Sequence, residues 1–181
     1  MTLLVSLLLA CNDGAGPIDT DGADTDVPAD PRLETDIVPI FQQSCGSGDN
    51  SCHSSVAYSA NADQGCRGWL SLEDASLGST YDGEPTGCED LDLYARLMQL
   101  SAWECHLNGD STNGNVGYDI AYVAPGDAEN SYLWRKISGG VLCDFTPDTP
   151  SQPMPLGGTL TGTERAILKA WIDNGAKRVG D

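Results

Sequence analysis

The sequence predicts a mainly α-helical domain with long loops and disulfides, preceded by an acidic segment that does not fold. Apolar residues recur at helical spacing in several stretches, and no long run alternates between apolar and polar residues. The chain contains seven cysteines, and its N-terminal part is rich in aspartate but poor in large apolar residues. Its 181 residues are enough for one domain with a real core plus a tail.

The first eleven residues resemble an export signal. Residues 1–10 are nearly all apolar, but a run this short does not span a bilayer, which needs about 20 apolar residues. The run ends in Leu8-Leu9-Ala10-Cys11, which resembles the lipobox of bacterial lipoproteins, whose cysteine is lipidated. We therefore expect residues 1–11 to be a signal peptide with lipidation at Cys11, and the protein to be an extracytoplasmic lipoprotein of the periplasm or outer membrane. The alternative is a chance apolar N-terminus.

Residues 12–33 are predicted to form a disordered acidic linker. Eight acidic residues lie between Asp13 and Asp36 against Arg32 alone, so this stretch supplies −7 of the net charge of −18. Too little apolar surface is present for this stretch to fold, and a lipoprotein needs such a spacer between membrane and domain. Its aspartates do not match an EF-hand, because the glycine falls at the wrong position. The overall charge also excludes nucleic acid as a partner, since no positive field is available to displace counterions.

Residues 34–181 are predicted to be the folded domain, beginning with two helices. The first spans residues 34–44, with Ile37, Ile40 and Phe41 at helical spacing and Pro39 near its start, where proline is tolerated. The second spans residues 89–101 and is amphipathic, with its apolar residues on one face.

Two further helices follow in the C-terminal half. Pro125-Gly126-Asp127 is typical of a turn that ends in an N-capping aspartate, and the helix after it should end at Gly139-Gly140. The last helix is the clearest, because Thr161-x-x-Glu164 forms a capping box and Gly175 supplies the stop. Its apolar face consists of Ile167, Leu168, Trp171 and Ile172.

A short loop carries the residues of a c-type haem site. Covalent haem attachment needs two thiols and a histidine directly after the second, and Cys45 with Cys52-His53 provides them. Met154, between two prolines, provides a soft second axial ligand. Six residues separate the cysteines, whereas the usual motif has two. Met98 competes as a ligand, but its spacing in the 89–101 helix makes it a core residue.

The chain resembles the c-type cytochrome domains of bacterial exported lipoproteins, which are related to class I cytochrome c and the planctomycete-type modules. The resemblance covers most of residues 34–177. It rests on Ile37-Val38-Pro39-Ile40-Phe41, Cys52-His53, Gly68-Trp69-Leu70-Ser71-Leu72, residues 123–127 and 130–133, Met154-Pro155 with Gly157-Gly158, and residues 170–176. It implies a small helical fold around one covalent haem c, held by Cys45, Cys52, His53 and Met154 and used for electron transfer, without catalysis by the protein. The acidic surface favours a redox partner with a basic surface.

The remaining cysteines are disulfide candidates. In an exported protein, the six cysteines after Cys11 allow three disulfides, or two thioethers with two disulfides, and their number does not decide between them. We expect Cys66 to pair with Cys88 and Cys105 with Cys143.

Three alternatives remain beside the haem interpretation. In a haem-free lipoprotein that keeps the same fold as a binding or structural module, Cys45 and Cys52 would form a disulfide. Zinc ligation by Cys45, Cys52, His53 and Cys66 is less favoured, because exported thiols are usually oxidised. His106, which follows Cys105, is a second possible axial ligand in place of Met154. No nucleophile motif or phosphate-binding glycine loop indicates an independent enzyme.

Overall fold

The structure, a computed structural model, is built of helices and connecting segments in the part of the chain that it describes. It describes residues 26–46, 53, 72, 92–102, 105, 120–143, 151–156 and 158–181. Within these ranges no strand occurs, and the single β-type feature is an isolated antiparallel bridge between Ser101 and Ala121. The prediction of a mainly α-helical domain is confirmed at this level; the cytochrome-like arrangement stays a prediction.

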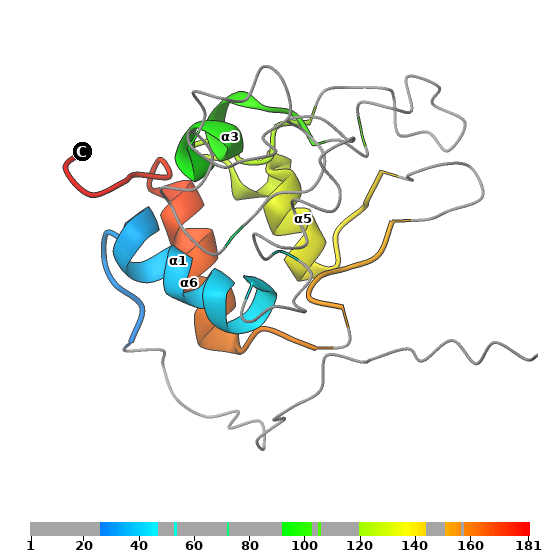
Figure 1. Cartoon of the computed structure of the whole chain (residues 1–181), viewed down its shortest axis with the longest axis horizontal. Coiled ribbons are helices and arrows are strands. Elements are labelled where there is room, and N and C mark those ends of the chain that lie inside the picture. The colour runs from blue at the N-terminus through cyan, green and yellow to red at the C-terminus, as the bar shows by residue number, and fades with distance from the viewer. Residues whose placement is uncertain are drawn as a thin grey trace, which may run out of the picture.

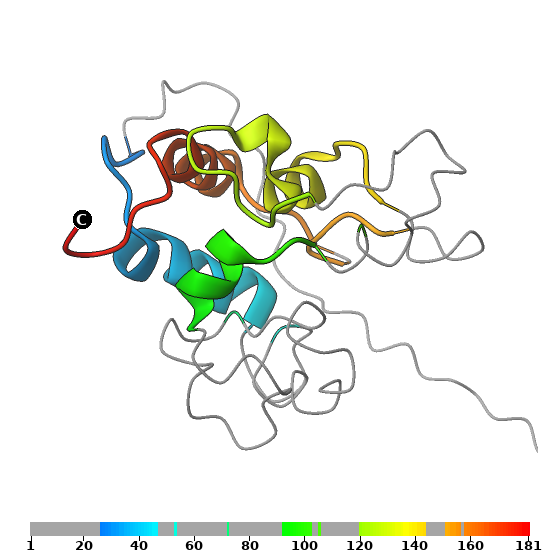
Figure 2. The same ribbon diagram turned by 90° about the horizontal axis from the view of Figure 1, so that it is seen from above.

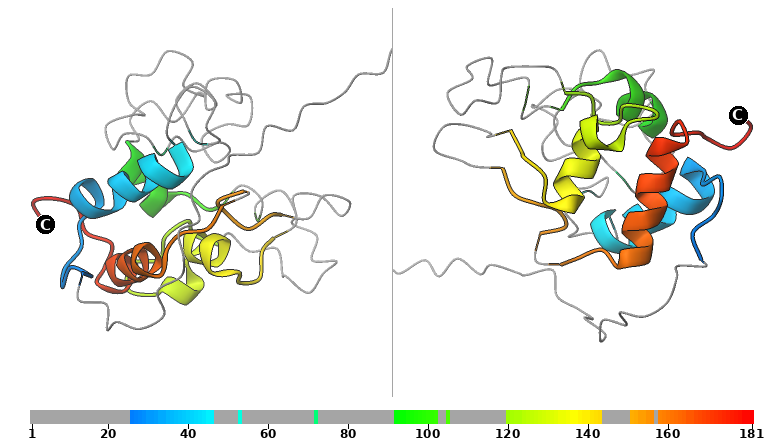
Figure 3. Two further views of the ribbon diagram at one scale, coloured as in Figure 1. Left: turned by 90° about the horizontal axis from the view of Figure 1, so that it is seen from below. Right: turned by 180° about the vertical axis from the view of Figure 1, so that it is seen from behind.

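The helices form two layers (Figure 1). The elements are η1 (Leu33–Ile37), α1 (Val38–Phe41), η2 (Gln42–Gly46), α3 (Leu93–Gln99), η4 (Ala128–Asn130), α5 (Tyr132–Ser138) and α6 (Gly162–Asp173). Seen from above, α5 and α6 lie side by side in one layer, with α1 and α3 in the other (Figure 2). The view from below shows the same arrangement (Figure 3).

The first helical segment runs without interruption from Leu33 to Gly46, slightly longer than the predicted 34–44. Its two ends, η1 and η2, are π-helical, and only the central four residues are a regular α-helix. Pro39 lies in the first turn of α1 at its junction with the π-helical η1, so it is an interior residue of the continuous segment and not one near its start. π-Helical turns are rare and often occur at functional sites, and η2 contains Cys45.

The folded part begins earlier than residue 34, which corrects the predicted end of the linker. Pro31 and Leu33 are fully buried, and the Leu33 amide donates a hydrogen bond to the carbonyl of Lys177 at 3.0 Å. Asp30 forms an ion pair with Lys177 at 3.0 Å. Composition alone placed these residues in the linker, because it does not reveal that the C-terminal segment binds them.

The three later helices are present, but α3 begins at Leu93, after the extended Asp92, and ends at Gln99, so it is shorter than the predicted 89–101. Asp92 caps α3, and Leu93 and Leu97 are buried within it. Met98 is half-buried against the core, as expected of an ordinary core residue. The predicted capping box of α6 is present, Leu168, Trp171 and Ile172 are buried, and Gly175 follows with φ of 96°.

The start of α5 differs from prediction. Asp127 accepts a hydrogen bond from the Asn130 amide, so it caps the short 3-10 helix η4 rather than α5. Ser131, whose backbone is extended, precedes α5, and Gly139 ends α5 with a left-handed φ of 79°. Ser131 is fully buried, and its hydroxyl accepts from the Ala124 amide at 2.8 Å. The tight turn therefore extends four residues beyond Asp127 before a regular helix begins.

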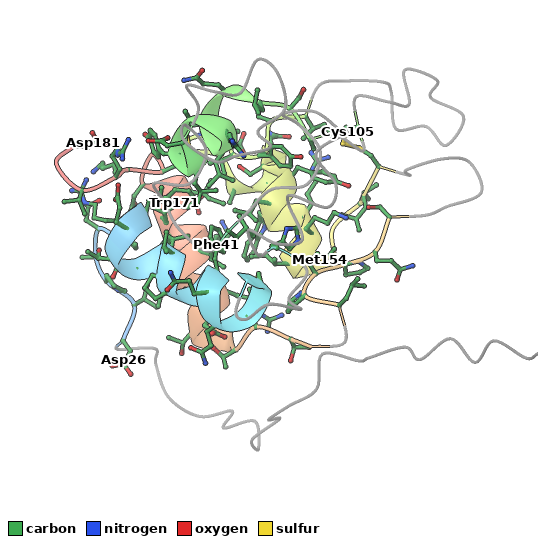
Figure 4. All side chains as sticks on the ribbon, viewed as in Figure 1. Asp26, Phe41, Cys105, Met154, Trp171 and Asp181 are labelled. Carbon is green, nitrogen blue, oxygen red and sulfur yellow. A yellow bond between two sulfur atoms is a disulfide. The ribbon has the colours of Figure 1, made fainter. Side chains whose placement is uncertain are left out.

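Two apolar clusters hold these elements together. The larger contains buried side chains of η1, α1, α3 and α6, among them Phe41 of α1 and Trp171 of α6, which Figure 4 labels. The smaller surrounds a disulfide and consists of Ala102, Cys105, Tyr132 and Cys143, with Ile120, Tyr122 and Leu142 packed against it. Tyr122 contacts both clusters and so links them.

Candidate functional site

Cys45 and His53 are brought together at the base of a closed loop. The His53 amide donates a hydrogen bond to the Cys45 carbonyl at 3.1 Å. Cys45 is the fourth residue of η2, and its half-buried side chain packs against the larger cluster. Cys52 lies outside the described residues, but a peptide bond joins it to His53. The residue that follows Cys52 therefore lies beside Cys45.

A second backbone contact ties His53 to the core. The Leu72 amide donates to the His53 carbonyl at 2.9 Å, and Leu72 is only 5 % exposed within the larger cluster. His53 itself is half-buried. Its backbone thus bonds to η2 on one side and to a core residue on the other, which limits where the imidazole can reach.

Met154 lies on a different element, near the C-terminal end of α5 (Figure 4). Its amide donates to the Lys136 carbonyl at 2.8 Å, and its side chain is half-buried. The Met154–Pro155 peptide bond is cis. Unlike Cys45 and Met98, Met154 is not among the partly buried side chains that pack against either cluster in the described part of the chain.

Side chains of α5 hold the residues just before Met154. The Lys136 ammonium donates to the Ser151 hydroxyl at 2.6 Å and to the Gln152 carbonyl at 3.1 Å. The Tyr132 and Ser151 hydroxyls are 3.3 Å apart, and the Lys136 nitrogen lies 5.6 Å from the centre of the Tyr132 ring. These contacts were not predicted from the sequence, because nothing in the sequence distinguishes Lys136 from a lysine that is exposed to solvent.

The disulfide between Cys105 and Cys143 is present, which confirms this predicted pairing. The two cysteines are 38 residues apart and are 3 % and 8 % exposed. Their cluster includes Tyr132, so the disulfide supports the tyrosine whose hydroxyl contacts Ser151. A disulfide agrees with an oxidising, extracytoplasmic setting, although it does not establish one.

A second charged cluster surrounds Arg178 near the C-terminus. Its guanidinium bonds to Glu34 and to Asp92, each at 3.1 Å, and lies 5.1 Å from the centre of the Tyr94 ring. Burial lowers the pKa of Arg178, but the hydrogen bonds to Asp92 and Glu34 outweigh it and the net pKa is raised. Burial also raises the pKa of Tyr94. These groups join the C-terminal segment to η1 and α3, and we assign them a structural role.

Several predicted residues lie outside the part of the chain that the structure describes. They are Cys11, Cys52, Cys66, Cys88 and His106, together with the signal peptide and most of the linker. Among the residues it describes, no group of three or more His, Cys, Asp or Glu side chains forms a metal site. Nor does any described helix have the length and apolar character needed to cross a membrane.

In comparisons with known proteins, no family model, curated protein or solved structure matches this chain.

Proposed function

We propose that this protein is a lipid-anchored, extracytoplasmic c-type cytochrome that carries one electron on a single haem. Cys45 and Cys52 would hold the haem through thioether bonds, with His53 and Met154 as the axial ligands. The observation that carries the proposal is the closure of the loop by the hydrogen bond between His53 and Cys45. It answers the strongest objection from sequence, the six-residue spacer between the cysteines.

The spacer matters because both thiols must reach one porphyrin. Six residues in an extended chain would cover roughly 20 Å, at about 3.3 Å per residue. The bond of 3.1 Å between the Cys45 carbonyl and the His53 amide removes this separation at the base of the loop. Cys45 and the residue that follows Cys52 are therefore close together in spite of the long spacer.

The chemical types of the donors also suit haem iron. A neutral imidazole and a thioether are the two axial ligands of many cytochromes c, and the thioether raises the reduction potential. Cys45, His53 and Met154 are all half-buried, so each is partly screened from water. Cys45 belongs to η2, whereas the Met154 amide is held by the Lys136 carbonyl of α5, so different elements position these two residues.

Bound haem would supply an iron that accepts one electron from a partner and passes it to another. The protein's residues would hold the iron, exclude water and present a docking surface. With a net charge of −18, this surface favours a partner with a basic face, and raising the salt concentration should slow their association.

The test is the absorption spectrum, oxidised and reduced, of the exported full-length chain from a host with c-type maturation, beside a haem stain of the denatured chain. Covalent haem is expected to survive denaturation and to give sharp bands on reduction. His53→Ala should abolish the native low-spin spectrum, whereas His106→Ala, which changes the second of the two histidines, should leave it unaltered. A haem spectrum unchanged by His53→Ala would refute the ligand assignment.

A haem-free lipoprotein is the second candidate, and the same loop closure favours it. A loop whose ends meet also suits a disulfide between Cys45 and Cys52. A colourless protein whose non-reduced peptide map joins these two cysteines would establish this alternative. The domain would then be a disulfide-stapled binding or structural module.

A further inference from the structure

We propose that Lys136 is a positioning residue that holds the Met154 segment in place for iron ligation. This inference rests on the proposed haem function and adds the part of the protein that sets the second axial ligand. It is carried by a set of contacts that converge on residues 151–154 from one face of α5.

Lys136 holds this segment at three points. Its carbonyl accepts the Met154 amide at 2.8 Å, so backbone and side chain act on the same segment. Its ammonium bonds to the Ser151 hydroxyl at 2.6 Å and to the Gln152 carbonyl at 3.1 Å. Hydrogen bonds from a charged donor are stronger than neutral ones, and two of them on adjacent residues fix direction as well as distance.

The base of this clamp is rigid. Tyr132 is 2 % exposed in the cluster around the Cys105–Cys143 disulfide. Its hydroxyl reaches Ser151 at 3.3 Å, and the Lys136 ammonium lies over its ring. The segment before Met154 is therefore connected through Tyr132 to a covalent cross-link.

These restraints matter because, among the described residues, packing against an apolar cluster does not fix Met154. Pro153 and Leu156 are exposed, and in the described residues Met154 does not pack against either apolar cluster. A methionine side chain with three rotatable bonds binds iron well only when its backbone is already in position. The clamp would supply this preorganisation without touching the iron.

The test compares Lys136→Gln with Lys136→Arg and Arg135→Gln in the full-length chain. Arg135 is the matched control, because its guanidinium bonds to the Glu129 carbonyl at 3.0 Å and to Asn130 instead of the Met154 segment. Two properties would be measured. The first is hydrogen exchange at the amides of Ser151, Gln152, Met154 and Leu156, since the two prolines of this segment have no amide hydrogen. The second, in haem-loaded protein, is methionine ligation, followed by the charge-transfer band of methionine-bound ferric iron and by the reduction potential.

Lys136→Gln should speed exchange in this segment about tenfold, the effect of losing a hydrogen bond from a charged donor worth about 1.5 kcal/mol. It should also weaken the methionine band and lower the potential. Lys136→Arg should restore both properties, and Arg135→Gln should change neither.

Each of the other possible outcomes would overturn a different part of the proposal for Lys136. Unchanged exchange in Lys136→Gln would show that no clamp exists. Faster exchange with an unchanged methionine band and potential would show a clamp that does not position the ligand. Protein without haem in every form would overturn the proposed function and, with it, the role in ligation, while exchange would still decide whether Lys136 holds the segment.

Discussion

Removing the Cys105–Cys143 disulfide should cost about 4 kcal/mol of unfolding free energy. The cysteines are 38 residues apart. In the chain-entropy account, a cross-link over a loop of this length lowers the entropy of the unfolded chain by about 13 cal/mol/K, or roughly 4 kcal/mol at 25 °C. The change to test is the double substitution Cys105→Ala and Cys143→Ala, which leaves no odd thiol behind.

The double substitution also weakens packing in the folded state, which adds to the loss of unfolding free energy. Both cysteines are almost fully buried, at 3 % and 8 % exposure, so alanine leaves small voids beside Tyr132. We expect these voids to add about 1 kcal/mol. Because small domains are stable by only about 5–15 kcal/mol, the variant should be close to unfolding at 37 °C.

Urea denaturation, monitored by tryptophan fluorescence, measures the total loss of unfolding free energy and its dependence on urea concentration. The midpoint should fall, and the dependence of the unfolding free energy on urea should steepen, because the unfolded chain exposes more surface without the cross-link. Val141→Ala is the matched control, since Val141 lies near Cys143 but is 66 % exposed, and should change stability by less than about 0.5 kcal/mol. A loss below about 1 kcal/mol with an unchanged slope would refute the loop-entropy argument.

Three other substitutions test the C-terminal helix and its contacts. Thr161→Ala removes the hydroxyl that accepts a hydrogen bond from the Glu164 amide, and should lower the unfolding free energy by about 1 kcal/mol in urea denaturation. An unchanged unfolding free energy would show that this cap does not stabilise the helix. Trp171→Phe removes the indole hydrogen bond to the Lys177 carbonyl at 2.8 Å and should cost about 1–2 kcal/mol; a neutral result would show that this bond does not contribute. The hydrogen bond from Lys177 lowers the pKa of Asp30, burial partly offsets it, and Arg32 lowers it further, so the net pKa lies below its usual 3.8. Because a lowered carboxyl pKa stabilises the fold at neutral pH and the effect is lost as pH falls through the folded-state pKa, Asp30→Asn should be less stable than the parent at pH 7 and equal to it near pH 2. A stability difference that stays constant from pH 7 to pH 2 would contradict this assignment.

Local signals in the sequence were sufficient for the best-defined helices. The Thr161 capping box and Gly175 stop depend on neighbouring residues, so the ends of α6 could be predicted. The same holds for Gly139, which ends α5, and for the apolar face that contains Trp171. The extra turn between Asp127 and α5 was not predicted, because a 3-10 helix and an α-helix share the same capping residues.

In the candidate site, too, some features were predicted from residue types and others are known only from the structure. Residue types alone led to the prediction of Cys45 as a haem attachment point and of His53 and Met154 as axial ligands, and these assignments stay predictions. The contact between Lys136 and Ser151 joins residues 15 positions apart, and the lysine resembles an ordinary surface charge in sequence. A composition rule likewise placed Pro31 in the linker, although it is buried.

The sequence by itself determined the helical class and the clearest helix ends. Each of these follows from a residue's own chemistry or from its near neighbours. Only the tertiary structure decided where the fold begins, that Cys45 and His53 meet across the spacer, and which side chains hold the segment of Met154. These features depend on contacts between distant residues, whose free energy comes from closing loops and burying surface together.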